Sequence, residues 1–197
     1  MRSGFYILFF FAFISVKAQL LDSLTLDTLT PYTSLVEAMK EPDKVIKLQL
    51  RKQRLKTFPK EIFMFKNLQY LDLGKNNIKL IPDSIGVLTN LQYLDVSRNI
   101  IEQISGNIGK LTNLFYLNLN NNEFSSLPPQ MGNLTKLRTL DLWSNNLDDF
   151  PEALKGMKSL QVLDLRVILI PDDKQKYISS LFPQTTIYFS PSCNCKW

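Results

Sequence analysis

Acidic and amide side chains recur at a fixed spacing in this sequence, and they are its first candidates for chemistry. The residues that stand 23 positions apart are Asp72, Asp95, Asn118, Asp141 and Asp164. Carboxylates held about 5 Å apart repel one another by roughly 1–3 kcal/mol. Such a row therefore suggests acid–base catalysis, a bound cation or a basic partner, unless neighbouring Arg51 or Arg138 offsets the charge.

The sequence contains no histidine. This removes the Ser-His-Asp and Cys-His nucleophile systems and the zinc sites that use histidine. No second catalytic group accompanies the aspartates, although a catalytic site needs several groups in defined roles. We therefore predict that the protein is not an enzyme and has no catalytic, cofactor-binding or metal-ligating residues.

Aromatic side chains follow the same spacing as the aspartates. Tyrosine and tryptophan are preferred anchors at protein interfaces. β-Propensity and stacking between strands also favour tyrosine in such a row, whereas a large exposed indole is harder to explain by propensity alone. We predict a partner-binding surface that consists of Tyr70, Tyr93, Tyr116, Trp143, Asp95, Asn118 and Asp141.

These side chains belong to a unit that repeats every 23 residues. LQYLDLGKN at 68–76 is followed by LQYLDVSRN at 91–99, LFYLNLNNN at 114–122 and LRTLDLWSN at 137–145. The fourth and sixth positions of each unit are apolar, as a strand with one buried face requires. One unit cannot bury that face alone, so equivalent strands must stack in a parallel sheet. Positions three, five and seven then point away from the core.

Three further rows complete the unit. Asparagine at the ninth position can satisfy backbone groups of its own turn and of the neighbouring turn, and we predict a structural asparagine ladder. Proline at the fifteenth position fixes φ on the return segment, and glycine at the nineteenth suits a tight backbone turn. The rows are Asn76, Asn99, Asn122 and Asn145; Pro59, Pro82, Pro128 and Pro151; and Gly86, Gly109 and Gly132.

The return segments LKTFPKEIFMFKN, IKLIPDSIGVLTN and FSSLPPQMGNLTK resemble the LPxxI-type leucine-rich repeats, which have 23-residue units. The N-terminal stretch ending EPDKVIKLQL is similar to the caps of exported bacterial repeat proteins. The resemblance implies an α/β fold, a right-handed solenoid with a concave parallel β-sheet and short helical caps. It also implies protein or peptide binding on that sheet and no catalysis.

The repeats divide the chain into expected segments. Residues 45–170 hold five full units and a partial sixth, and terminal segments must cover the exposed ends of the core. In the N-terminal cap, 19–44, we expect a capping box from Ser34 to Glu37 and a short helix whose apolar side is Leu35, Val36 and Met39. In the C-terminal segment, 171–197, we expect a helix from 172 to 182, capped by its first two aspartates, and a strand over 186–189.

Residues 1–18 carry the pattern of a secretory signal peptide. Arg2 precedes an apolar run from Phe5 to Val16, and a cut before Gln19 would follow Ala18. The alternative is a membrane anchor, but this run is well short of the roughly 20 residues that span a bilayer. We predict export, with no stable membrane insertion after cleavage.

Cys193 and Cys195 are the only cysteines. Export permits a disulfide between them, although the ring would be small and strained. Intermolecular or reduced thiols and a metal-binding pair are the alternatives. With Arg2 and Lys17 removed from the 23 basic residues, the remaining 21 exceed the 18 acidic residues by 3. This mild charge gives no case for a nucleic-acid partner.

These features together predict a secreted protein-interaction module that binds an unknown protein or peptide on the concave face. The expected location is periplasmic or extracellular, and no cofactor is expected. Glycan binding is the first alternative, because aromatic faces beside aspartate and asparagine also suit sugars. A purely structural role in the cell envelope is the second.

Overall fold

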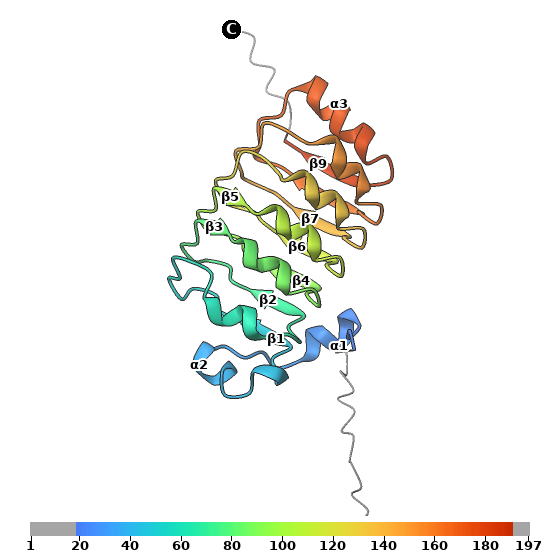
Figure 1. Cartoon of the computed structure of the whole chain (residues 1–197). Helices are drawn as coiled ribbons and strands as arrows, with labels where there is room; N and C mark the ends of the chain where they lie inside the picture. Colours follow the sequence, from blue (N-terminus) through green and yellow to red (C-terminus); the bar gives the residue numbers. More distant parts are fainter. Residues whose placement is uncertain (1–18, 191–197) are drawn as a thin grey trace, which may run out of the picture.

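A computed structural model describes residues 19–190, and its main element is a seven-stranded parallel sheet (Figure 1). The strands pair in the order β1 (Lys47–Gln49), β2 (Tyr70–Asp72), β4 (Tyr93–Asp95), β6 (Tyr116–Asn118), β7 (Thr139–Asp141), β8 (Val162–Leu165) and β9 (Thr186–Phe189). Equivalent residues of successive units lie opposite one another, as Tyr70 pairs with Tyr93 and Tyr93 with Tyr116. The predicted α/β solenoid of stacked repeats is confirmed.

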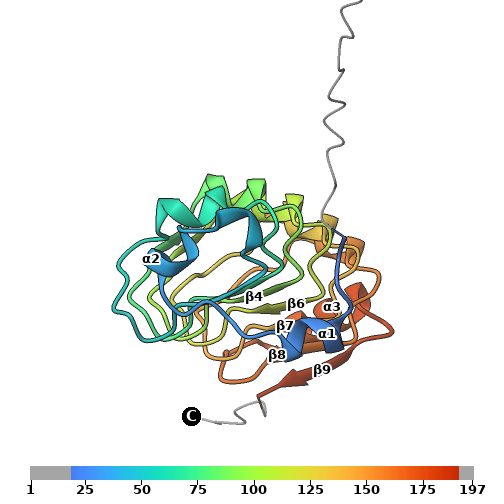
Figure 2. The same cartoon turned by 90° about the horizontal axis from the view of Figure 1, so that it is seen from below.

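Short 3-10 helices line the opposite side of the stack, as Figure 2 shows. They are η2 (Lys60–Met64), η3 (Asp83–Val87), η4 (Gly106–Lys110), η5 (Pro129–Asn133) and η6 (Glu152–Gly156). Proline precedes four of them at the N-cap, with φ between −58° and −78°. Ser105 replaces proline before η4, and its hydroxyl accepts a hydrogen bond from Asn107 N. A small second sheet joins β3 (Leu80–Ile81) to β5 (Gln103–Ile104).

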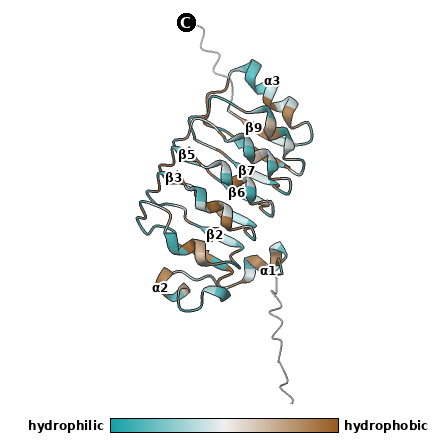
Figure 3. Cartoon of the chain, in the orientation of Figure 1, coloured by the Kyte–Doolittle hydropathy of each residue, from teal (hydrophilic) through white to brown (hydrophobic). Residues whose placement is uncertain are grey.

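The core lies between the sheet and the 3-10 helices. Leu71, Leu94 and Leu117, at the fourth position of successive units, are fully buried. Figure 3 shows hydrophobic and hydrophilic segments within each turn, because every unit gives some side chains to the core and some to the surface. We call the surface formed by the strand side chains that point away from the core the concave face.

The sharp turn after each strand does not use glycine. The eighth position of six successive units has φ between 51° and 61°, the left-handed region: Lys52, Lys75, Arg98, Asn121, Ser144 and Val167. No glycine in 19–190 has a positive φ. The predicted row of Gly86, Gly109 and Gly132 lies in the tight turns of η3, η4 and η5, but a left-handed backbone is not the reason for glycine there. A Cβ on Gly109 would lie 2.2 Å from the carbonyl oxygen of Gln130, so glycine is required there by the close approach of neighbouring 3-10 helices.

The N-terminal cap consists of α1 (Ser23–Thr28), α2 (Leu35–Ala38) and η1 (Pro42–Lys44). Tyr32 extends the sheet by one bridge to β1, since its backbone N donates to Lys47 O and its carbonyl accepts from Gln49 N. The predicted capping box is wrong, because the Ser34 side chain makes no capping hydrogen bond. Val36 is 72% exposed, and Ala38 is buried in its place, because a four-residue helix turns only part of one side to the core.

The C-terminal cap consists of α3 (Asp172–Leu181) and β9, which spans the predicted strand. Pro171, and not an aspartate, is the N-cap of α3. Asp172 and Asp173 lie in the first turn, where their negative charges interact favourably with the helix dipole. No helix in residues 19–190 is long and apolar enough to cross a membrane. The predicted signal peptide at 1–18 and the predicted disulfide between Cys193 and Cys195 lie outside the described residues.

Candidate functional site

The tyrosine row on the concave face forms a continuous stack. The ring centroids of Tyr70 and Tyr93 are 4.0 Å apart, those of Tyr93 and Tyr116 are 4.4 Å apart, and both pairs are parallel within 3°. In-register parallel strands produce this arrangement, because each ring stands one strand spacing from the next. Lys47 Nζ lies 4.6 Å from the Tyr70 centroid and continues the stack.

Stacking covers much of this row. Tyr70 is only 8% exposed, and Tyr93 and Tyr116 are half-buried. The expectation that all three tyrosines are open to a partner is therefore wrong for Tyr70. Burial raises the pKa of all three hydroxyls, and nearby aspartates add to this effect. Tyr93 and Tyr116 are the members of the row that keep some exposed surface.

The aspartate row is held by the backbone. At each of five successive turns the side-chain Oδ1 at position five accepts a hydrogen bond from the backbone N two residues later, at 2.8–3.1 Å. Asp72, Asp95 and Asn118 are 3%, 5% and 8% exposed. Asp95 and Asn118, predicted as contact residues, are therefore buried turn-forming residues, whereas Asp141 is half-buried.

Arg51 neutralises the start of the aspartate row. Its Nη1 donates to Asp72 Oδ1 at 2.8 Å and to Asp95 Oδ2 at 3.0 Å. Burial raises the pKa of Asp72 in spite of this pair. Burial also raises the pKa of Asp141, whose Oδ2 accepts from Asn120 Nδ2 at 2.6 Å. No group of three or more acidic or cysteine side chains in residues 19–190 is arranged to hold a metal ion.

The asparagine row lies under the turns that follow the strands. Asn99 Nδ2 donates to Leu73 O at 3.1 Å in the preceding turn and to Val96 O at 2.9 Å in its own turn. Its Oδ1 accepts from Ile78 N at 2.9 Å. The same pattern recurs at Asn76 and Asn122, so the asparagines tie each turn to the one before it.

Trp143 lies at the seventh position of its unit, directly after β7, and is half-buried. Its backbone N donates to Asp141 Oδ1 at 3.0 Å and its carbonyl accepts from Asn121 N at 2.8 Å. These bonds fix the backbone beneath the indole, so the aromatic side chain is presented at the concave face from a rigid support.

The chain's own N-terminal segment covers the first strands, which the sequence pattern did not predict. Leu21 N donates to Gln69 Oε1 at 2.9 Å, and Gln92 Nε2 donates to Leu21 O at 2.8 Å. Lys47 Nζ donates to the carbonyls of Leu26 and Asp27 at the end of α1. Figure 1 shows α1 beside β1 and β2. The concave face is therefore open chiefly from β4 onwards.

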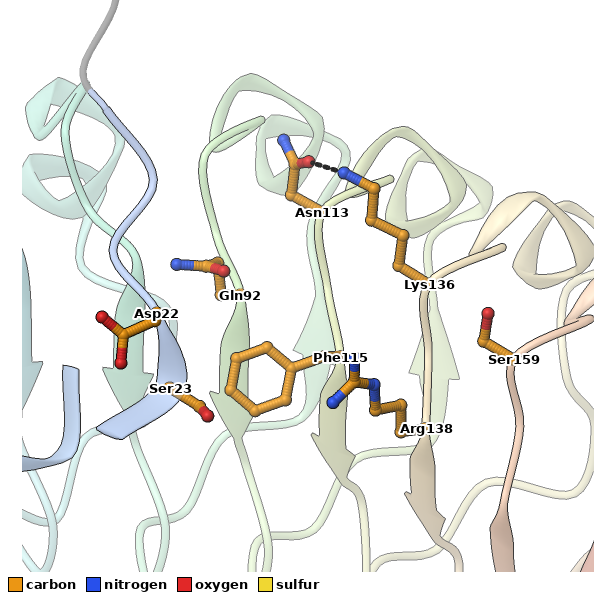
Figure 4. A pocket seen from close by; sticks show the side chains of 8 residues that line it. All are labelled: Asp22, Ser23, Gln92, Asn113, Phe115, Lys136, Arg138 and Ser159. Atoms are coloured by element: carbon orange, nitrogen blue, oxygen red, sulfur yellow. Dashed lines mark hydrogen bonds between the residues drawn. The ribbon is translucent and has the colours of Figure 1, made fainter. Parts of the chain in front are cut away.

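A pocket of about 360 Å³ lies at the boundary between this segment and the open face (Figure 4). Asp22 and Ser23 form one side, Phe115 lies in the middle, and Lys136 and Arg138 form the other side. The sequence prediction named none of these residues as a site. The available signal was the change from glutamine to phenylalanine and arginine at equivalent positions of successive units.

Three overlapping stretches of the sequence, 44–101, 89–147 and 112–166, match the family model described as leucine rich repeat. Together they span more than half of the chain. The chain belongs to the leucine-rich repeat family. Such proteins are in general protein-interaction scaffolds and not enzymes, so protein binding is the general activity that membership supports.

Solved structures of leucine-rich repeat proteins are similar to this chain. A leucine-rich repeat protein of Leptospira interrogans is 30% identical, with a TM-score of 0.67, over 84% of this chain and 49% of its own. Internalin C2 of Listeria monocytogenes is 26% identical, with a TM-score of 0.65, over 77% of this chain and 64% of its own. A TDR receptor is 29% identical, with a TM-score of 0.58, over 68% of this chain and 24% of its own.

The chain spans about half of the Leptospira protein and somewhat less than two-thirds of internalin C2. No curated protein sequence matches it. The similar solved structures include proteins of two bacteria, in agreement with the predicted resemblance to bacterial leucine-rich repeat proteins.

Proposed function

We propose that this leucine-rich repeat protein is an exported module that binds a protein or peptide on its concave face. The observation that carries the proposal is the set of aromatic side chains on β4, β6 and the turn after β7. Tyr93, Tyr116 and Trp143 lie beyond the part of the sheet that α1 covers, and each keeps some exposed surface. Rigid, partly exposed aromatic groups on a fixed sheet are favourable anchors for a protein partner.

Each of the predicted contact residues has a distinct part in this proposal. Trp143 and the exposed parts of Tyr93 and Tyr116 would contact the partner, and half-buried Asp141 would add a polar contact. Tyr70, Asp95 and Asn118 would act indirectly, because their side chains are buried and shape the surface from below.

The geometry favours a protein over a glycan. A sugar ring packs against the open face of an aromatic ring, but Tyr93 has a tyrosine against each face. Export is supported by the signal-peptide pattern of residues 1–18, and N-terminal sequencing of exported protein should begin at Gln19.

A crosslinking pull-down tests the proposal with two matched variants of the chain from Gln19. Trp143→Ala removes a large side chain from the concave face, and Met64→Ala removes a 52% exposed apolar side chain from η2 on the other side. We expect a partner captured by the wild type and by Met64→Ala to be lost or strongly reduced with Trp143→Ala. Equal capture by all three proteins, or loss with Met64→Ala alone, would place the site elsewhere.

A further inference from the structure

One row of side chains lies directly before the strands of the sheet. Its members from β2 to β8 are Gln69, Gln92, Phe115, Arg138 and Gln161. The backbone N of each donates to the carbonyl of the one before: Gln92 to Gln69 at 2.8 Å, Phe115 to Gln92 at 2.9 Å and Arg138 to Phe115 at 2.8 Å. Consecutive members are therefore direct neighbours along the edge of the sheet.

The chain's own segment 19–22 shows how a peptide lies on this row. Gln69 accepts from Leu21 N at 2.9 Å through Oε1 and donates to Gln19 O at 3.1 Å through Nε2. Gln92 Nε2 donates to Leu21 O at 2.8 Å and to Gln69 Oε1 at 2.9 Å. These bonds to the segment reach only its backbone groups. The row can therefore hold a peptide main chain without regard to its side chains.

The row changes character where this segment turns away from it. Asp22 is the N-cap of α1, and α1 leads back to β1, where Lys47 Nζ binds the carbonyls of Leu26 and Asp27. The next members of the row are half-buried Phe115 and exposed Arg138 in place of glutamine. An aromatic ring and a guanidinium therefore follow where the covering segment ends.

A second row lies two residues before the first along the chain and changes at the member two residues before Arg138. Asn67, Asn90 and Asn113 each donate through Nδ2 to the backbone carbonyl 24 residues earlier, at 2.7–2.9 Å. The next member is Lys136, whose Nζ donates to the Asn113 side chain at 2.8 Å and to no backbone group of residues 19–190. In the first row Phe115 and Arg138 stand in place of glutamine, and in the second row Lys136 stands in place of asparagine, so two cations lie two residues apart in the chain.

The pocket between these rows has the charge and size for an anionic side chain. Its volume is about 360 Å³. The Arg138 guanidinium makes no hydrogen bond or ion pair with any residue that the structure describes. Asp22, the acidic residue at the pocket, already accepts from Thr25 N and Thr25 Oγ1, and Figure 4 shows its carboxylate turned away from Arg138 and Lys136.

We propose that this pocket binds an aspartate or glutamate side chain of an extended peptide that continues the line of residues 19–22 across β6 and β7. The Arg138 guanidinium would donate two parallel hydrogen bonds to the carboxylate, and Lys136 would add a second positive charge. Phe115 would pack against the aliphatic part of the acidic side chain. This proposal rests on the proposed function and names its ligand class, an acidic peptide.

Panning a phage-displayed library of random dodecapeptides against residues 19–197 tests the ligand class. The enriched peptides should share an aspartate or glutamate. Arg138→Ala, and separately the change of that acid to its amide in a synthetic peptide, should each weaken binding about 10- to 100-fold, as loss of a charge-assisted contact predicts. The two changes together should cost little more than either alone, because they remove the same contact.

The matched control removes the same number of positive charges elsewhere. Lys136→Ala with Arg138→Ala is compared with Lys60→Ala with Lys79→Ala, since Lys60 and Lys79 are exposed and outside the pocket. The control pair should keep its affinity within about twofold, as expected for distant surface charges. Circular dichroism should show both pairs folded, because Arg138 makes no side-chain bond to the described residues.

The outcomes separate this proposal from the proposed function. Enriched peptides without a shared acid, or with equal affinity for the pocket variant, would overturn the pocket proposal. The concave-face function would still stand if those peptides lost affinity for Trp143→Ala. Absence of any enriched peptide, or equal binding to the wild type, the pocket variant and Trp143→Ala, would count against both.

Discussion

Asn99 and Asn145 occupy equivalent positions in two turns of the solenoid but do not make equivalent bonds. Both donate through Nδ2 to carbonyls of their own and the preceding turn. Asn99 Oδ1 also accepts from the buried Ile78 N, whereas Asn145 Oδ1 is buried with no partner among residues 19–190. A difference of one acceptor bond therefore distinguishes two otherwise similar side chains.

This difference predicts unequal costs of substitution. Asn99→Ala leaves the Ile78 N–H without an acceptor, and Asn145→Ala leaves no such donor. We expect Asn99→Ala to lower the free energy of unfolding by about 1–3 kcal/mol more than Asn145→Ala, the usual cost of one buried unpaired donor. Urea unfolding of both variants measures this. Equal losses would show that the acceptor bond contributes nothing.

The stacked tyrosines predict weaker stability at high pH. Burial raises the pKa of Tyr93 above the ordinary value of 10.0, so the folded chain keeps this hydroxyl protonated where the unfolded chain loses its proton. The resulting contribution to stability is complete below pH 10 and is lost as the pH rises further. At pH 11 the loss from one such group is roughly 1 kcal/mol relative to pH 9.

Tyr93→Phe is the control for this alkaline effect, because it removes the titrating hydroxyl and keeps the ring stack. Urea midpoints at pH 9 and pH 11 should fall less for this variant than for the wild type. The same fall in both proteins would contradict a raised pKa at Tyr93.

At the scale of the elements, the spacing of the 3-10 helices is set by glycine. A Cβ on Gly132 would lie 2.0 Å from the carbonyl oxygen of Ala153 in η6, so η5 and η6 would have to separate. A Cβ on Gly86 would first meet Lys110 Cδ at 2.9 Å, at the flexible end of a side chain, and then a backbone oxygen at 3.2 Å.

We therefore expect Gly132→Ala to destabilise the chain by about 1–3 kcal/mol, the range for overpacking, and Gly86→Ala to cost clearly less. Thermal unfolding followed by circular dichroism ranks the two variants. A Gly86→Ala protein that melts at or below the temperature of Gly132→Ala would refute the close-approach explanation.

The repeat period was sufficient to predict the strands, their register and the rows of buried leucines. Each unit follows one local pattern, so Tyr70, Tyr93 and Tyr116 had to lie opposite one another. The position of the N-terminal segment could not be predicted in this way. Its contacts join Leu21 to Gln69 and Gln92, which are 48 and 71 residues away, through single side-chain bonds that carry no periodic signal.

The sequence could predict which residues belong to the candidate surface, but not how exposed their side chains are. The pattern predicted that Asp95 and Asn118 lie on the concave side, as observed. It did not predict the backbone hydrogen bonds and the neighbouring side chains that bury them. The close approach that requires glycine in its row could not be predicted, because contacts with the next 3-10 helix depend on how closely the units stack. Packing distances of this kind are set by the whole assembly of turns.

At the scale of the whole molecule, the solenoid presents two contrasting sides. One side consists of short 3-10 helices, and the other is a parallel sheet whose first strands are covered by α1 (Figures 1 and 2). We propose that the partner lies on the uncovered strands of the sheet. A residue between the tyrosine row and β8 should therefore lie beneath a bound partner.

The most direct test is site-specific photocrosslinking. A photoreactive amino acid is placed at Thr139, which is half-buried on β7 between Tyr116 and Val162, or at exposed Met64 on η2. We expect Thr139 to crosslink the partner captured by the wild-type chain and Met64 not to crosslink it. A crosslink from Met64 without one from Thr139 would contradict binding on the concave face.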